Sequence, residues 1–209
     1  MVISLVLNLI NAVVTLALMT RIFRAEDGSF SQEKGTKALR FFTNLSNIFS
    51  AIACLILAVC EIILLSRGQG IDQLPYWAVL VKYLGTSSVF VTFLTVMAFL
   101  GPIYTYKAML EKTGAWVHAA GPLLAIISFC FFEKVYRFGF TPAWTGILPM
   151  LFYGIFYLYR VVYQTEERGG WPDFYSFNKG GKWPISFTAM VLGTALICVI
   201  LTVLHNIGL

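Results

Sequence analysis

Residues 40–65 read RFFTNLSNIFSAIACLILAVCEIILL, a polar opening followed by an almost unbroken apolar run. A helix that crosses a bilayer needs about 20 predominantly apolar residues, and this stretch has that length. Five other stretches also qualify, near residues 2–23, 76–100, 114–133, 143–163 and 185–207. The sequence therefore predicts an all-α, polytopic membrane protein with six transmembrane helices in one bundle.

The composition supports this class. Hydrophobic residues make up 58% of the chain and charged residues 12%, with a mean hydropathy of +0.78. Ordinary soluble domains have about 25% charged residues, so this class is excluded. The connections between the predicted spans are short, and we expect residues 1–209 to form one domain. The first span starts at Met1 without a preceding basic segment, so we expect it to remain as an anchor.

The basic residues are distributed unequally between the two ends of the predicted bundle. Four of the 15 lie toward one end: Arg67, Lys82, Lys134 and Arg137. The other eleven lie in or beside the first, third and fifth loops: Arg21, Arg24, Lys34, Lys37, Arg40, Lys107, Lys112, Arg160, Arg168, Lys179 and Lys182. The positive-inside rule predicts that these odd loops are cytoplasmic and that both termini face outward, in the cell inner membrane if the protein is bacterial.

The net charge of +5 is then a property of the topology and of contact with anionic lipid headgroups. Nucleic acid binding would need a basic soluble surface, which this chain lacks. We therefore expect membrane lipids as partners and no nucleic acid. The sequence predicts neither a metal site nor a cofactor, and the four cysteines, which all fall within predicted spans, are expected to act as small hydrophobic side chains.

The polar opening of residues 40–65 has helical periodicity. Thr43, Ser46, Asn47 and Ser50 are spaced i, i+3, i+4 and i+7, which places them on one face of the helix, toward the bundle interior. Such a stripe is also typical of hydrogen bonding between membrane helices, so it does not by itself indicate a functional site. Asn8, Asn11 and Thr15 share a face of the first span and are expected to serve that packing role.

His118 lies in the segment WVHAAGP of the fourth predicted span, and an ionisable side chain within a span is a functional hypothesis. If that span begins near Lys112, His118 is about 9 Å deep, while Thr43 is about 4.5 Å past Arg40. Pro122 cannot donate to the His118 carbonyl, so Gly121-Pro122 predicts a kink and a pocket beside His118. A histidine that simply bonds a neighbouring helix is the alternative.

A threonine hydroxyl becomes a nucleophile when a base takes its proton, and His118 is the side chain at that depth able to do so. Asn44 and Asn47 are candidate donors to the developing oxyanion. Thr95, Tyr157 and Arg160 are candidate pocket residues in the same half of the membrane. Arg160 could bind a carboxylate or phosphate headgroup, or extend to the interface as membrane arginines commonly do.

Three segments resemble a known family: RFFTNLSN (40–47), VHAAGPLLAIISFCFFE (117–133), and LPMLFYGIFYLYRVV (148–162) with GGWPDFYSF (169–177). They are similar to the second, fourth and fifth spans of the androgen-induced membrane proteins and their six-span bacterial relatives. The resemblance implies an intramembrane threonine hydrolase that cleaves fatty acid esters of hydroxy fatty acids, with Thr43 as nucleophile and His118 as its partner. Trp171-Pro172 replaces a tyrosine-proline pair of the bacterial pattern, so the implied substrate is a long-chain acyl ester and no named lipid.

Two further features complete the prediction. The loop 164–184 is rich in aromatic residues and glycines, which indicates an interfacial anchor or, alternatively, a lid over Thr43 and His118. Glu61, Lys82 and Glu133 fall toward the outer ends of their spans, where pairing with one another or simple interfacial placement is favoured over catalysis. A non-catalytic lipid-binding protein or a small transporter is the alternative function, although transporters tend to show inverted repeats that this sequence lacks.

Overall fold

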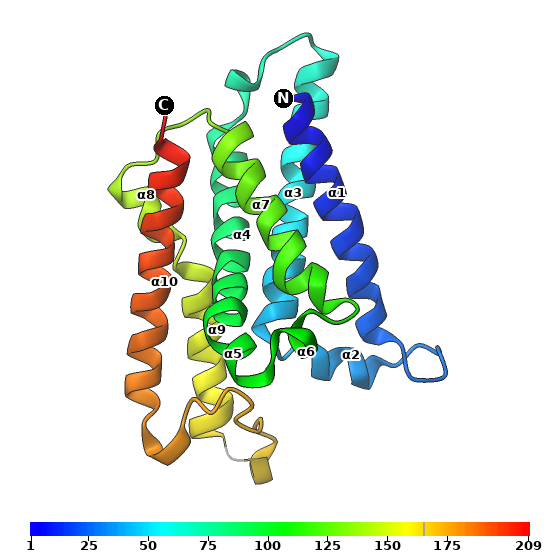
Figure 1. The fold of residues 1–209 in the computed structure, drawn as a ribbon, viewed down its shortest axis with the longest axis vertical. Helices are drawn as coiled ribbons and strands as arrows, with labels where there is room; N and C mark the ends of the chain where they lie inside the picture. The colour runs from blue at the N-terminus through cyan, green and yellow to red at the C-terminus, as the bar shows by residue number, and fades with distance from the viewer. Residues whose placement is uncertain (165) are drawn as a thin grey trace.

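The computed structural model describes residues 1–164 and 166–209 (Figure 1). Within these residues there are helices and no β-strand, so the all-α prediction is confirmed. The principal helices are α1 (Val2–Met19), α2 (Gln32–Ala38), α3 (Phe42–Ser66), α4 (Tyr76–Thr95), α5 (Gly101–Tyr104), α6 (Tyr106–Leu110), α7 (Gly121–Ile127), α8 (Phe140–Thr145), α9 (Leu148–Leu158) and α10 (Trp183–Asn206). Several are extended by short 3-10 or π-helical segments: η1 (Thr20–Phe23), η3 (Val96–Leu100), η4 (Trp116–Ala120), η5 (Ser128–Phe132) and η6 (Tyr159–Tyr163).

Five helical stretches are long and apolar enough to cross a membrane: Val2–Phe23, Phe42–Ser66, Tyr76–Tyr104, Phe140–Tyr163 and Trp183–Asn206. They match five of the six predicted spans. The remaining prediction, 114–133, corresponds to the shorter apolar helix Trp116–Phe132. The chain therefore has the fold of a multi-pass membrane protein, and a sixth crossing remains a prediction.

The shorter helix is irregular at both ends. Its first turn, η4, is π-helical, and the Gly121 N–H bonds the Trp116 carbonyl, five residues earlier. Pro122 has no N–H to donate, so the hydrogen bond that a regular helix would make to the His118 carbonyl is missing, and regular α-helix (α7) begins only at Gly121. A widened turn is thus present where the sequence predicts a kink. Single π-helical turns of this kind are frequent at functional sites.

The bundle is centred on the contact between α3 and α4. A Cβ atom added at Gly85 of α4 would lie 2.9 Å from Ala53 Cβ and 3.0 Å from Ser50 Cα, so only glycine allows these backbones to approach so closely. Small residues serve this purpose in membrane helices, where packing replaces the hydrophobic effect. The hydroxyls of Ser46 and Thr92 add a hydrogen bond of 2.8 Å. Helix α7 packs on both α1 and α4 (Figure 1).

The two ends of the bundle differ. Figure 1 places both termini at one end, and α2, α6 and the loop after η6 at the opposite end. The first, third and fifth loops, which hold most of the basic residues, therefore share one end of the molecule. The charge pattern predicts that this end is cytoplasmic.

Candidate functional site

The first turn of α3 holds the candidate nucleophile. Thr43 follows Phe42, the first residue of the helix, and its side chain is half-buried. Its backbone carbonyl oxygen accepts hydrogen bonds from Ser46 Oγ at 3.1 Å and from Asn47 Nδ2 at 2.8 Å. Ser46, Asn47 and Ser50 are buried, so the predicted polar stripe does face the interior.

Asn47 connects this turn to the helix that carries His118. Its Nδ2 also donates to the Val117 carbonyl at 3.0 Å, and Val117 precedes His118 in η4. One amide group therefore holds the backbones of Thr43 and Val117 together. Because both hydrogens of Nδ2 are engaged, Asn47 has none to offer an oxyanion in this arrangement. Its role here is positioning.

The His118 ring is oriented by one hydrogen bond. Its Nδ1 lies 2.7 Å from the backbone carbonyl oxygen of Met109. A carbonyl only accepts hydrogen bonds, so Nδ1 must carry the proton. In the neutral ring the lone pair then belongs to Nε2, and the tautomer is set by the bond that the other nitrogen makes. His118 is thus held as a base that can accept a proton at Nε2.

Met109 reaches His118 because the chain turns back sharply on either side of α6. Thr105, which precedes α6, has φ +70° and ψ 138°, and Lys112, which follows it, has φ +54°. Positive φ is uncommon for residues other than glycine, and for the β-branched Thr105 it is a strained conformation. A Cβ atom added at Gly114 would overlap the Met109 carbonyl and lie 3.5 Å from His118 Nδ1. The absence of a side chain at Gly114 therefore permits the contact that orients His118.

Asn44 has a different partner from the one expected. Its Nδ2 donates to the Ala38 carbonyl at 2.8 Å, which ties the start of α3 to the end of α2. In the described part of the chain the second hydrogen of this amide has no acceptor, so Asn44 could still donate one hydrogen bond to an oxyanion. Among the described residues no hydrogen bond joins the side chains of Thr43 and His118. The link that the structure shows between the two segments is the Asn47 amide, which bonds the carbonyls of Thr43 and Val117.

Thr95 is not part of this site. It is exposed at the end of α4, whereas Thr92, three residues earlier, is buried and bonds Ser46. A residue three positions further along a helix is rotated by about 60° from the first, and here that rotation moves the side chain from the interior to the surface.

Tyr157 and Arg160 organise the loop that follows their helix. Tyr157 Oη donates to Asp173 Oδ1 at 2.9 Å. Arg160 donates to Gln164 Oε1 at 2.7 Å, and its guanidinium lies 5.4 Å from the centre of the Trp171 ring. Both side chains thus hold the loop rather than line an open pocket, and the predicted headgroup role of Arg160 would require it to exchange these partners.

The aromatic loop covers the start of α3. The Phe42 backbone N–H donates to Tyr175 Oη at 3.0 Å, and the ring of Phe174 packs 4.5 Å from that of Phe41. Burial raises the pKa of the Tyr175 phenol, which keeps it neutral. The loop is therefore anchored beside Thr43. Sequence reasoning placed it at this end of the bundle and included Asp173 and Tyr175 in the segment GGWPDFYSF, but gave neither residue a contact with Tyr157 or Phe42.

A groove of about 690 Å³ lies away from these residues. Its lining is mostly apolar, from the end of α1, the first loop and α3: Leu16, Met19, Phe23, Phe30 and Ile48, with Thr20, Arg24 and Gly28. Thr43 and His118 do not line it. Among the described residues, no group of three or more His, Cys, Asp or Glu could hold a metal ion.

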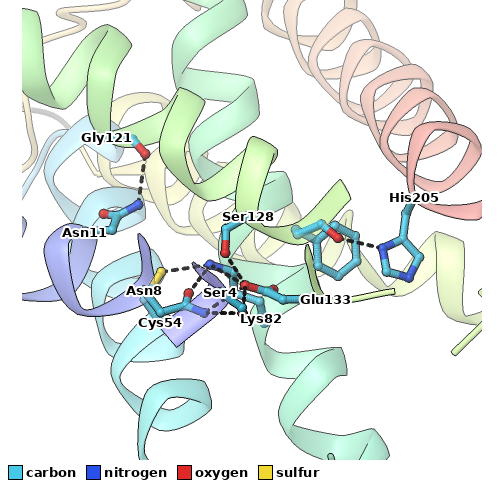
Figure 2. A network of polar contacts seen from close by, with 10 residues as sticks. Ser4, Asn8, Asn11, Cys54, Lys82, Gly121, Ser128, Glu133 and His205 are labelled. Atoms are coloured by element: carbon cyan, nitrogen blue, oxygen red, sulfur yellow. Dashed lines mark hydrogen bonds and ion pairs between the residues drawn. The ribbon is translucent and has the colours of Figure 1, made fainter. Parts of the chain in front are cut away.

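A second polar cluster joins α1, α3, α4 and the residue after η5 (Figure 2). Lys82 Nζ is 3.7 Å from Glu133 Oε1 and donates to Asn8 Oδ1 at 2.6 Å and Cys54 Sγ at 3.0 Å. Glu133 Oε1 also accepts from Asn8 Nδ2 at 2.8 Å and from the Ser128 hydroxyl. The predicted pairing of Lys82 with a glutamate is thus confirmed, but its burial is deeper than an interfacial position implies.

Comparison of the chain with protein-family models, with curated proteins and with solved structures found no match. The fold and the intramembrane polar residues together define an integral, multi-pass membrane protein. The activity of that protein is argued below from its own residues.

Proposed function

We propose that the protein is an intramembrane hydrolase of long-chain fatty acyl esters, with Thr43 as nucleophile and His118 as general base. The observation that carries the proposal is the bond from His118 Nδ1 to the Met109 carbonyl at 2.7 Å. It leaves Nε2 as the proton acceptor, in a helix that Asn47 ties to the Thr43 turn. The resemblance to the androgen-induced membrane proteins supports the same two residues and esters of hydroxy fatty acids as substrates.

The reaction proceeds in two stages. Thr43 Oγ attacks the ester carbonyl carbon while His118 Nε2 takes the hydroxyl proton. The tetrahedral intermediate expels the alcohol, which receives that proton from His118, and an acyl-threonine remains. Water then attacks the acyl-threonine with His118 again as base, which releases the fatty acid and restores Thr43. Attack requires the acyl carbon to approach within about 3.5 Å of the Thr43 oxygen.

The approach of a substrate requires a change in the aromatic loop. Tyr175 and Phe174 lie over the start of α3, so a lipid entering from the bilayer would have to displace this contact. The loop thus fits the lid hypothesis better than a purely interfacial anchor. Asn44, with one free amide hydrogen, is the remaining oxyanion candidate of the two asparagines.

The test is hydrolysis of a panel of long-chain esters, including esters of hydroxy fatty acids, by the purified protein. Thr43→Ala should abolish turnover, and His118→Ala should lower it by about 10²- to 10⁴-fold, the usual contribution of a general base. Thr43→Ser keeps a hydroxyl and should retain measurable activity. Thr36→Ala, on the exposed face of α2 at the same end of the molecule, is the matched control and should not change the rate.

Labelling with a fluorophosphonate gives an independent readout. The wild type should be labelled and Thr43→Ala should not. Turnover that survives in both Thr43→Ala and His118→Ala would contradict the proposal, as would a wild type that turns over no ester. Retention of lipid by all variants without turnover would instead establish the alternative, a non-catalytic lipid-binding protein or transporter.

A further inference from the structure

Three ionisable side chains are completely buried at the end of the bundle that carries the termini. Glu61 of α3, Lys82 of α4 and Glu133, the residue after η5, each have 0% of their surface exposed. Glu61 is 18 residues from Thr43, or about 27 Å along the helix. This cluster is therefore separate from the proposed hydrolase site and does not depend on it.

Glu133 and Glu61 have different surroundings. Glu133 Oε1 faces Lys82 Nζ and accepts from Asn8 Nδ2, from Ser4 Oγ at 3.3 Å and from the Ser128 hydroxyl, as expected of an ionised carboxylate (Figure 2). Within the described residues, neither oxygen of Glu61 has a hydrogen-bond partner, and Glu133 Oε2 also has none.

Every element packed around Glu61 contributes to its charge environment. Helix α1 faces it with the neutral Ser4 and Asn8, α4 with Lys82, and the end of η5 with Glu133. On its own helix its titratable neighbour is the thiol of Cys60, while Cys54, about two turns earlier on α3, contacts Lys82. Around Glu61 there are thus two carboxyl groups and one ammonium, and Lys82 can balance only one of the carboxylates. His205 of α10 lies beyond Glu133, where its ring nitrogens contact the carbonyl oxygens of Phe129 and Tyr136 at 2.9 and 3.0 Å, and it does not face Glu61.

The unbalanced charge must be removed. A buried carboxylate without a counter-ion is strongly disfavoured, and in practice such a group takes up a proton. A metal cation is a poorer solution, because only three carboxylate oxygens are free and the Lys82 ammonium would repel it. Protonated Glu61, by contrast, leaves a neutral cluster with an ion pair between Lys82 and Glu133.

We propose that this cluster is a proton-binding site within the membrane and that Glu61 carries its proton at neutral pH. Ionisable groups within membrane spans are typical of proton relays. Here Glu61 lies next to the Lys82–Glu133 ion pair, in which Glu133 could accept the proton and return it. No part of the proposed ester hydrolysis uses these residues.

Infrared spectroscopy of the purified protein in an ester-free detergent tests the proposal directly. At neutral pH the wild type should show a protonated-carboxyl C=O stretching band that shifts in D2O. Glu61→Asp should move this band and Glu133→Asp should leave it in place. Lys82→Met removes the counter-ion, so Glu133 should also take up a proton and the band should grow to about twice its area. Glu111→Gln, an exposed carboxyl, is the control and should change nothing.

Absence of the band from the wild type at neutral pH would overturn the proposal, and this measurement needs no variant. A band that moves in Glu133→Asp and not in Glu61→Asp would place the proton on the other carboxyl and would also overturn it. Loss of the band on addition of sodium at constant pH would identify a metal cation as the ligand instead of a proton.

Discussion

Gly114 is the residue that permits the His118 contact, because any side chain there would meet the Met109 carbonyl. Gly114→Ala should push Met109 away and release the His118 ring. A displacement of about 1 Å at a catalytic group can lower activity by about 10²-fold. Gly193→Ala is the matched control, since a Cβ atom at that position meets no atom within 4 Å.

The effect of Gly114→Ala can also be measured on the tautomer of the His118 ring, independently of activity. Nitrogen-15 NMR of labelled histidine distinguishes the two ring tautomers, and the chain has 2 histidines, so His118→Ala assigns the signals. The wild type should show the His118 proton on Nδ1, and Gly114→Ala should show a mixture of tautomers. An unchanged spectrum in Gly114→Ala would contradict the role given to this glycine.

At the scale of elements, the close approach of α3 and α4 depends on Gly85. Gly85→Leu would place a side chain against Ala53 and the Ser50 backbone and force the helices apart. Overpacking of this kind costs about 1–3 kcal/mol. A thermal unfolding curve in detergent should therefore show a lower Tm. Gly193→Leu, on the exposed face of α10, should unfold at the wild-type temperature, and equal Tm values for both variants would refute the packing argument.

The helices were predictable where local pattern determines them. The stripe of Ser46, Asn47 and Ser50 follows from helical periodicity alone, and its burial is confirmed. On α1, Asn11 bonds the Gly121 carbonyl at 2.9 Å, which is the predicted packing role. The irregular turn at η4 was anticipated as a kink, since Pro122 removes a donor, but its π-helical form was not.

The partners of the site residues could not be predicted, because they come from loops whose paths depend on the whole fold. Nothing in the sequence connects Met109 with His118, since the contact follows from the turns at Thr105 and Lys112. The Tyr175 contact with Phe42 spans 133 positions of the chain. Thr95 was a candidate because of its predicted depth in the membrane, but its position around the axis of α4 places it on the surface and not beside the site.

For the whole molecule, the distribution of basic residues predicts the orientation in the membrane. In sealed cells, a cysteine introduced at exposed Gln69 should react with a membrane-impermeant maleimide, and one at exposed Thr36 should react only after permeabilisation. The native cysteines must not react with the maleimide. Three of them are buried (Cys54, Cys130 and Cys198) and Cys60 is half-buried, so the two cysteines should be introduced into the Cys60→Ala variant. The reverse labelling pattern would show that the odd loops face outward.

The hydrogen bond from Phe42 N–H to Tyr175 Oη couples the loop to the electrostatics of α3. The first N–H groups of a helix lack partners within it, and the positive end of the helix dipole lies among them. In the closed loop the Tyr175 hydroxyl oxygen accepts a hydrogen bond from one of these N–H groups, that of Phe42. Displacement of the loop would cost that hydrogen bond, about 0.5–1.5 kcal/mol, and would expose an unpaired donor one residue from Thr43. Opening the loop would therefore also make the surroundings of Thr43 more favourable to negative charge.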